Sequence, residues 1–387
     1  MTIPHLLLVD DNELNRDMLA RRVRQQGYTF DMAENGREAL EKLSATPYDL
    51  VLLDIMMPEV DGYAVLEQAK ADPALRHIPI IMISAIDEIE STARCIEMGA
   101  DDYLTKPFNP TLLKARIQSS LEKKRLRDNE QRYTQSLAQD LEIGRRIQGS
   151  FLPDALPVNP GWELVAVFQP ARQVSGDFYD AFSLVGGTHL GIVMADVCDK
   201  GVGAALFMAL FRTLIRAMSE SNFPAQNATS TEIAASLQKT IIQTNEYIAR
   251  THGNANMFAT IFFGVQNLQS GTLHYINGGH EPPLLRRTAG ANEYLEPTGP
   301  IVGALPEMEF AVQSVQINPG DTLLCYTDGV SEARNSAGDF FGEGQLPGLM
   351  HASAQASTDA ILEKLRIFIG DAPQNDDITM LALRRVG

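Results

Sequence analysis

The sequence predicts an α/β domain with a doubly wound parallel sheet, then a long helix, then a larger α+β domain. Up to about residue 120, short apolar runs alternate with amphipathic stretches, which is typical of βαβ units. Between Pro110 and Pro153 there is no further proline, glycine is absent before Gly144, and Leu, Glu, Lys, Arg and Gln are abundant. Beyond this segment, runs of strands interrupted by paired helical patterns favour two sheets with helices outside them.

The first domain is expected to span residues 1–120. Its strands are predicted at His5–Val9, Thr29–Ala33, Leu50–Leu53, Ile78–Ile83 and Asp101–Leu104. Its helices are predicted at Glu13–Gln26, Gly36–Ser44, Gly62–Ala71 and Glu88–Met98, with a further helix from Pro110. A parallel sheet of this kind is covered on both faces and binds ligands at the carboxyl ends of its strands.

Polar side chains gather at those strand ends. Asp10 and Asp11 close the first strand, Asp54 the third and Ser84 the fourth, and Lys106 follows the fifth. Three carboxylates together need a cation, and Mg²⁺ prefers such oxygen ligands. With Mg²⁺ and Lys106 present, the Asp54 carboxylate could attack a phosphoryl donor, while Ser84 donates a hydrogen bond to the incoming phosphoryl oxygen.

This half closely resembles a bacterial response-regulator receiver domain of the CheY-like, flavodoxin-like type. The resemblance covers the whole segment through the acidic pair, the phosphoacceptor in LLDIMMPEVDG, Ser84-Ala85 and Lys106-Pro107. It implies that a sensor histidine kinase is the partner that phosphorylates Asp54. It also implies that Tyr103, at the position of the aromatic switch residue, turns inward and reshapes the face formed by the last two helices.

A helical linker is expected over residues 121–152. Apolar residues recur at intervals of three, four and seven along the predicted helix, at Leu112, Leu113, Ile117, Leu121, Leu126, Tyr133, Leu137, Leu141, Ile147 and Phe151. A long helix with one apolar stripe must bury that stripe, and a parallel coiled-coil homodimer is the first interpretation. A helix folded back onto one domain is the alternative, since the register is irregular and Arg127–Arg132 is polar.

The second domain is expected over residues 153–387. Strands are predicted at Trp162–Gln169, His189–Ala195, Phe258–Val265, Thr272–Asn277 and Thr322–Thr327, and near Pro283–Arg286, Phe310–Val315 and Ile378–Leu383. Helices are predicted at Ala204–Ser219, Thr231–Thr251 and Asp359–Phe368.

Aspartates recur where these strands begin or end. Asp196 follows an apolar strand, as Asp328 does, Asp177 closes a loop, and Asp376 and Asp377 precede the last strand. Asp196 alone could equally be a helix N-cap or a hydrated loop residue. Several such carboxylates without a Cys or His cluster suit Mg²⁺ or Mn²⁺, and a pair of these ions can direct a hydroxide at phosphorus. The pattern therefore favours a two-metal hydrolase.

These residues resemble the metal-dependent (PPM) Ser/Thr phosphatases of the SpoIIE/RsbU class. The matching segments are RRIQGSFLP, VSGDFYD, ADVCDKGVGAALFM, MFATIFFG, NGGHEPPLL, YTDGVSEARN with FFGEG, and NDDIT. The resemblance implies that Asp196 bridges two Mn²⁺ or Mg²⁺ ions and that the Val197 backbone carbonyl joins one of them. It further implies that Asp328 and Asp376 complete the first metal, that Asp177 serves the second, and that water is the nucleophile.

The sequence departs from this family at one turn and leaves one assignment open. Cys198-Asp199 stands where the family usually has Ser-Gly, which adds a carboxylate near the metals without removing a ligand. Asp377 could exchange roles with Asp376. His280 is expected to be structural because the mechanism needs no imidazole.

Composition narrows the classes of partner. The formal net charge of −17 disfavours binding to nucleic acid or to an anionic membrane face. The start of the chain lacks the basic region of a signal peptide, and no run of about 18 uncharged apolar residues is present. Three scattered cysteines favour a reducing cytoplasm over a disulfide framework.

Together these expectations describe a response regulator in which phosphorylation of Asp54 controls a metal-dependent phosphoserine/phosphothreonine phosphatase. By resemblance, the substrate is an anti-sigma factor antagonist of the STAS type in a partner-switching pathway. The alternative is a binding adaptor that sequesters or delivers a sigma factor or related regulator without using phosphatase activity. The four aspartates expected to bind metal are all present, which favours the enzyme.

Overall fold

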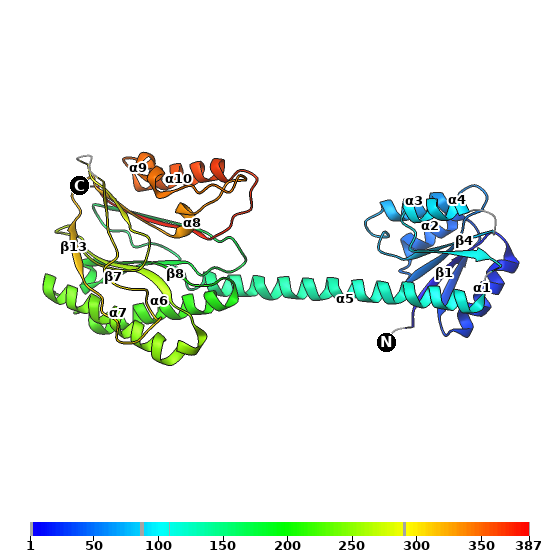
Figure 1. Ribbon diagram of the computed structural model, residues 1–387, viewed down its shortest axis with the longest axis horizontal. Coiled ribbons are helices and arrows are strands. Elements are labelled where there is room, and N and C mark those ends of the chain that lie inside the picture. The colour runs from blue at the N-terminus through cyan, green and yellow to red at the C-terminus, as the bar shows by residue number, and fades with distance from the viewer. Residues whose placement is uncertain (1–2, 86–88, 108, 289–291, 387) are drawn as a thin grey trace. The chain divides into compact units, whose positions relative to one another are not determined.

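The computed structural model describes residues 3–85, 89–107, 109–288 and 292–386, with the side chains of 85 and 89–92 left out of the description. The chain forms two compact units, residues 1–137 and 138–387. Helix α5 (Pro110–Gly149) begins in the first unit and ends in the second (Figure 1).

The first unit is built on a parallel sheet in the order β2-β1-β3-β4-β5. Its strands are β1 (His5–Val9), β2 (Thr29–Ala33), β3 (Leu50–Asp54), β4 (Ile80–Ala85) and β5 (Asp102–Lys106). Its helices before α5 are α1 (Glu13–Gln25), α2 (Gly36–Ala45), α3 (Gly62–Ala71) and α4 (Ile89–Glu97). The order confirms the doubly wound α/β prediction.

Each face of this sheet has its own apolar core, because residues of β1 and β3 are buried alternately on the two sides. Leu7, Val9, Val51 and Leu53 pack with side chains of α2, α3 and α4. On the opposite face, Leu6, Leu8, Leu50 and Leu52 pack with side chains of α1 and of the start of α5. The asparagine and aspartate side chains that precede the first three helices cap them, at Asn12, Asn35 and Asp61.

Helix α5 confirms the predicted long helix. Its first turns bury Leu113 and Ile117 against the first unit. Further along, the Lys124 amine pairs with Asp49, which precedes β3, and with Asp128 one turn on in the helix. From Glu130 to Asp140 every residue is exposed, including Tyr133 and Leu137.

The second unit contains two sheets, as predicted, and the strands of both are antiparallel. One sheet has the order β13-β10-β9-β8-β7 and the other β12-β11-β14-β15-β6. The first comprises β7 (Phe178–Leu184), β8 (His189–Val197), β9 (Ala259–Asn267), β10 (Thr272–Gly278) and β13 (Gln313–Gln316). The second comprises β6 (Trp162–Gln169), β11 (Leu284–Arg286), β12 (Asn292–Tyr294), β14 (Thr322–Tyr326) and β15 (Ile378–Arg385).

Helices cover the outer faces of both sheets (Figure 1). The long helices α6 (Val202–Asn222) and α7 (Ser230–His252) pack on the sheet that contains β8 and β9. On the other sheet lie α8 (Asp328–Ser331), α9 (Leu346–Leu349) and α10 (Ala354–Ile369). A third apolar cluster, which includes Ile192, Phe262, Leu323 and Leu381, fills the space between the sheets.

Helix α6 is the one described helix whose length and hydropathy would allow it to cross a membrane. Its inward residues, among them Met208, Phe211 and Ile215, are buried in the core. Its two arginines, Arg212 and Arg216, pair with the buried Asp180 of β7. These contacts are those of a core helix packed on a sheet.

Most predicted elements are confirmed to within a few residues, with some differences. The strand β7, which directly follows the loop that Asp177 closes, was not predicted, nor were the short elements β12, α8 and α9. Helix α10 begins at Ala354, five residues before the predicted Asp359, because the Ser353 side chain caps it and Ala354 is buried in the core. The predicted strand Phe310–Val315 is instead β13, Gln313–Gln316, since Phe310 belongs to the buried cluster under α7. Glu88, the first residue of one predicted helix, lies outside the described residues.

We expect Asp180→Ala to lower the free energy of unfolding of the second unit by about 3 kcal/mol, because it leaves two partly buried guanidinium groups without a counter-charge. The Asp180 carboxylate lies 2.6 and 2.7 Å from Arg216 and 3.1 Å from Arg212. Urea unfolding can be followed by the fluorescence of Trp162, the single tryptophan of the chain. The control Glu363→Ala removes an exposed pair with Arg366 and should cost less than about 1 kcal/mol. Equal losses of unfolding free energy in both variants would contradict the role of Asp180 as the buried counter-charge of the two arginines.

Candidate functional site

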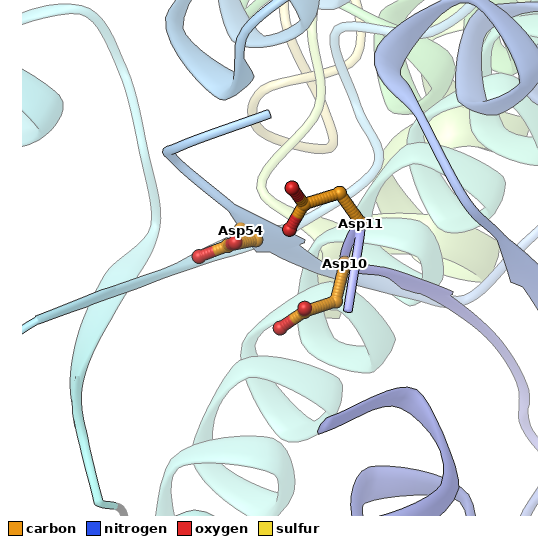
Figure 2. A group of neighbouring side chains, drawn as sticks. All are labelled: Asp10, Asp11 and Asp54. Carbon is orange, nitrogen blue, oxygen red and sulfur yellow. The ribbon is translucent and has the colours of Figure 1, made fainter. Parts of the chain in front are cut away.

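Asp10, Asp11 and Asp54 form an acidic cluster at the carboxyl ends of β1 and β3. Their ligand oxygens lie within 4.8 Å of one another, and Figure 2 shows the three side chains extending to the same side. Asp10 and Asp54 are buried, whereas Asp11 is exposed. Asp10 also accepts hydrogen bonds from the Asn12 amide at 3.0 Å and the Asn15 side chain at 3.2 Å, which fix its orientation. The predicted carboxylates are therefore brought together.

Lys106 is the cation beside this cluster. Its amine lies 2.8 Å from an oxygen of Asp10 and 2.8 Å from an oxygen of Asp54. Burial raises the pKa of Asp54 to about 6; the bond to Lys106 opposes this rise, and the charges of Asp10 and Asp11 add to it. Burial opposes the charge of Lys106, but its bonds to the two aspartates outweigh burial and raise its pKa. One amine thus compensates only part of the negative charge, which fits an additional divalent cation.

The two other predicted residues of the first unit lie on neighbouring strands. Ser84 is buried near the end of β4, one residue beyond the partner of Asp54 in the ladder. Tyr103 lies on β5, half-buried and packed against the cluster under α3 and α4. Ser84 therefore sits at the same sheet edge as the carboxylates, and Tyr103 lies three residues before Lys106 on the strand that carries it.

In the second unit, the predicted metal ligands meet where the two sheets approach each other. Asp196 is the penultimate residue of β8, and Asp177 lies beside it because Phe178 pairs with Ala195 in the ladder. Asp328 begins α8 two residues after the end of β14, and Asp376 lies two residues before β15. The Asp177 carboxylate accepts hydrogen bonds from Thr327 at 2.7 Å and Thr379 at 2.5 Å. Thr379 lies on β15 of the opposite sheet and Thr327 directly follows its strand β14, so these bonds tie the two sheets together at the site.

The carboxylates of this group raise one another's pKa. Burial and the charge of Asp196 hold the pKa of Asp177 well above its ordinary range. Burial and the charge of Asp328 raise the pKa of Asp196 to about 7, and burial and the charge of Asp376 raise that of Asp328 to about 6. Such a concentration of partly buried negative charge is costly unless a cation compensates it.

The residues present fit divalent metal ions. Carboxylate oxygens without a Cys or His partner are the donor set of Mg²⁺ and Mn²⁺. Across the described ranges, only the Asp10 cluster brings three ligand atoms within 4.8 Å of one another. Among the described residues of the second unit, no three such ligand atoms lie that close together.

Asp376 and Asp377 differ clearly in their surroundings. The Asp377 carboxylate is buried and accepts hydrogen bonds from the Ala171 amide, the Gly176 amide and the Ser175 hydroxyl. Asp376 is half-exposed, and its carboxylate lies 2.7 Å from the Lys200 amine. Because Asp377 is buried and is bonded to three donors of the 171–176 segment, it anchors that loop, and the more exposed Asp376 is the candidate ligand.

The turn between β8 and α6 shows what the Cys198-Asp199 departure does. Asp199 adopts a left-handed backbone with a φ of 70°, a conformation for which glycine is the ordinary choice. Its carboxylate accepts a bond from the Lys200 amide, so this extra acid caps the turn locally. Cys198 accepts a bond from the Phe258 amide, and burial raises the pKa of its thiol.

Two further residues clarify the site. His280 is buried and burial lowers its pKa to about 3, so it is neutral, which supports the structural role expected for it. Gly329 follows Asp328, and a Cβ there would lie 1.9 Å from the Asp377 carbonyl oxygen. A side chain at this position would push the segments of Asp328 and Asp377 apart.

Sequence reasoning missed Lys200, Thr327 and Thr379, which hold Asp376 and Asp177 in place. Each lies within four residues of a predicted ligand in sequence, at the end of the same strand or turn. Their hydrogen bonds join residues 150 and more positions apart, so only the adjacency to the aspartates could have indicated them.

Without metal, the second unit should be less stable at pH 8 than at pH 5.5. The folded-state pKa values of Asp196 and Asp328, about 7 and about 6, lie above the ordinary value of about 4 for an unfolded chain. The stability from binding these protons is therefore fully present below about pH 4 and is lost as pH rises through 6 to 7. The test is thermal unfolding in EDTA, followed by Trp162 fluorescence.

Asp196→Asn serves as the matched variant in this experiment. Because it removes one of the repelling charges, it should raise the Tm at pH 8 and reduce the difference between the two pH values. A wild-type Tm that is equal at both values, or higher at pH 8, would contradict the expected repulsion.

Comparison with known proteins identifies both units. The family model for stage II sporulation protein E (SpoIIE) matches residues 186–386, more than half of the chain. The response regulator receiver domain model matches residues 6–118. The SiaA-PP2C domain of Pseudomonas aeruginosa superposes with a TM-score of 0.52 at 21% identity, covering 65% of this chain and 98% of that one, which shows the shared fold.

Two curated relatives match at higher identity. Protein IcfG of Synechocystis is 45% identical over 263 residues, 64% of this chain and 41% of that protein. The probable transcriptional regulator ycf27 of Cyanidium caldarium is 44% identical over 117 residues, 30% of this chain and 46% of that protein. The chain thus spans less than half the length of each of these relatives. From the family matches and the fold, the chain belongs to the SpoIIE family and is a response regulator that joins a receiver domain to a phosphatase-type output domain.

Proposed function

We propose that phosphorylation of Asp54 controls a metal-dependent phosphoserine/phosphothreonine phosphatase in the second unit. The observation that carries this proposal is the group of Asp177, Asp196 and Asp328, whose pKa values are raised by burial and by neighbouring carboxylates. Such a concentration of negative charge is energetically unfavourable until cations bind to it. A protein that acts only as a binding adaptor would have no use for this unfavourable arrangement.

In the proposed site, Asp196 would serve both of two Mn²⁺ or Mg²⁺ ions, and the Val197 carbonyl would join one of them. Asp328 and Asp376 would complete the first position, and Asp177 would serve the second. The ions, when bound, supply charge stabilisation and an activated water for attack on phosphorus. The chain's own part is to hold these carboxylates apart at a fixed spacing, which the threonine bonds to Asp177 support.

In the receiver, we propose that Asp54 takes the phosphoryl group from a sensor histidine kinase. Asp10 and Asp11 would hold Mg²⁺, Lys106 would pair with a phosphoryl oxygen, and Ser84 would donate a hydrogen bond to another. Lys106 already contacts Asp54, so it is placed to change partner when the carboxylate becomes an acyl phosphate. Tyr103 would respond by turning inward at the face formed by β5 and its neighbouring helices.

We further propose an anti-sigma factor antagonist of the STAS type as the substrate and a cytoplasmic partner-switching pathway as the setting. This part depends on the family resemblance, and a phosphorylated seryl or threonyl side chain is the chemistry that a two-metal site accepts. No nucleic-acid or membrane partner is proposed, in keeping with the net charge of −17.

The central prediction concerns turnover of a phosphorylated STAS-type protein. Wild-type protein should release phosphate only with Mn²⁺ or Mg²⁺, and Asp196→Asn should lose at least about a hundredfold in rate because the bridging carboxylate is gone. Beryllofluoride, which mimics the phosphoryl group on Asp54, should change the wild-type rate. Phosphate release is the measurement.

The control is Asp54→Asn, which should keep metal-dependent turnover and lose the response to beryllofluoride. Turnover that ignores the mimic would separate the phosphatase from the receiver. A folded wild-type protein without turnover under any of these conditions would favour the adaptor.

Substitution of the neighbouring residues Asp376 and Asp377 should have two different effects, one on metal dependence and one on stability. Asp376→Asn should raise the Mn²⁺ concentration needed for half-maximal activity by about tenfold or more while leaving the Tm nearly unchanged, because it removes a ligand. Asp377→Asn should lower the Tm by several degrees, since three donors lose their carboxylate partner. The measurements are metal titrations of activity and thermal unfolding of both variants. The reverse pattern would make Asp377 the ligand.

A homodimer through α5 is also proposed. Leu126, Tyr133, Leu137 and Ile147 are exposed large side chains along this helix, and a second copy would cover them. The double variant Tyr133→Glu/Leu137→Glu should reduce the mass in light scattering from dimer to monomer. A wild-type monomer at tens of micromolar would rule out this dimer.

A further inference from the structure

The end of helix α5 carries a polar residue that is buried although its neighbours are not. From Ala138 to Gly149, every residue of which is described, Gln148 is the only buried one, with 7% of its surface exposed. A buried glutamine side chain keeps a low free energy only if both its amide nitrogen and its oxygen are bonded. The partners of Gln148 therefore identify what this helix end is built to hold.

Both partners belong to a single residue, Ser175. The Gln148 amide nitrogen donates to the Ser175 carbonyl at 2.6 Å, and its oxygen accepts from the Ser175 amide at 3.0 Å. Ser175 is itself fully buried, 27 positions along the chain. This two-point contact fixes both the position of α5 along its axis and its rotation, since a shift of one residue turns a helical side chain by about 100°.

Ser175 in turn supports the loop Ser175–Asp177, which carries the proposed metal ligand Asp177. Its hydroxyl donates to the Asp377 carboxylate at 2.6 Å and accepts from the Asp177 amide at 3.0 Å. The Gly176 amide donates to the same Asp377 oxygen at 3.2 Å. One continuous set of hydrogen bonds therefore runs from Gln148 to the backbone of Asp177, one of the proposed ligands.

The loop cannot move without disturbing the rest of the site. A Cβ at Gly176 would lie 2.7 Å from the Val197 carbonyl oxygen and 3.4 Å from a carboxylate oxygen of Asp196. The loop backbone thus packs directly against two further groups proposed to bind metal. A shift of Gln148 along the axis of α5 would therefore displace Asp177, Val197 and Asp196 together.

We propose that Gln148 is a positioning residue: it holds the Ser175–Asp177 loop, and through it the metal ligands, at the spacing set by helix α5. The inference rests on the proposed phosphatase function and deepens it, because it names the contact by which the helix shared with the receiver unit reaches the metal site. Gln148 itself touches neither metal nor substrate.

The first test uses the full-length, metal-free protein. Gln148→Met keeps the length of the side chain and removes both hydrogen bonds, and Arg145→Met changes an exposed residue one turn earlier whose partner is Glu142. Hydrogen exchange of the peptide covering 170–180 should be at least about tenfold faster in Gln148→Met, because the Ser175, Gly176 and Asp177 amides lose protection. A peptide from β9 should be unchanged in both variants.

The second test measures hydrolysis of p-nitrophenyl phosphate as a function of Mn²⁺. Gln148→Met should raise the Mn²⁺ concentration for half-maximal rate by about tenfold, with kcat at saturating Mn²⁺ within about threefold of wild type. Arg145→Met should match wild type. A role in packing alone would lower the Tm and kcat and leave the Mn²⁺ dependence in place, which would overturn the proposal.

The experiments distinguish failure of the phosphatase proposal from failure of the proposed role of Gln148. If wild-type protein shows no Mn²⁺-dependent turnover, the phosphatase proposal fails, while the exchange experiment still decides whether Gln148 holds the loop. Unchanged exchange at 170–180 in Gln148→Met overturns the inference whatever the activity. If that variant does not fold, Gln148→Asn, which keeps the amide on a shorter stem, is expected to give the same pattern and is judged by the same outcomes.

Discussion

Repulsion between buried carboxylates is the constraint on which both units depend. In each unit the fold carries aspartates to the ends of strands and buries most of them there, fully or in part, so that every negative charge raises the cost of the next. Hydrogen bonds from Thr327 and Thr379 to Asp177 offset part of this cost without neutralising it. The surrounding structure has to be rigid enough to keep these groups together, and two sheets joined at the site provide that rigidity.

The two units differ in how much of the charge they compensate themselves. In the receiver, the Lys106 amine contacts two of the three carboxylates and comes from a strand of the same sheet. In the second unit, Asp376 is the one carboxylate with a described ion pair to the Lys200 amine, and no described cation contacts Asp177 or Asp196. Added cations should therefore matter more for the integrity of the second site than for that of the first.

The sequence was sufficient for the fold class and for the position of most strands, because apolar alternation and glycine-rich turns are local signals. It was also sufficient to single out Asp10, Asp54, Asp196 and Asp328, since a carboxylate directly after an apolar strand is a local anomaly. The strand β7 was missed because its residues Phe178–Leu184 mix polar and aromatic side chains beside the Asp177 motif. Polar residues in or beside a functional motif can interrupt the apolar alternation by which a strand is predicted.

What the sequence could not separate were residues whose roles depend on partners far along the chain. Asp376 and Asp377 are adjacent and chemically identical, and they differ only because the segment Ala171–Gly176 folds back to donate to Asp377. Gln148 lies in a segment of resemblance, RRIQGSFLP, yet a glutamine on a polar helix gives no sign of burial until Ser175 is brought against it.

The same contacts explain why a site of this kind suits regulation. Asp377 and Gln148 both hold the loop of Asp177 through Ser175, one from the segment before strand β15 and one from helix α5. A loop held by a few short hydrogen bonds to two elements has a defined position, but a small displacement of either support changes its relation to Asp196. Because the metal ions would need the carboxylates at fixed separations, such a displacement is enough to alter their binding without unfolding either sheet.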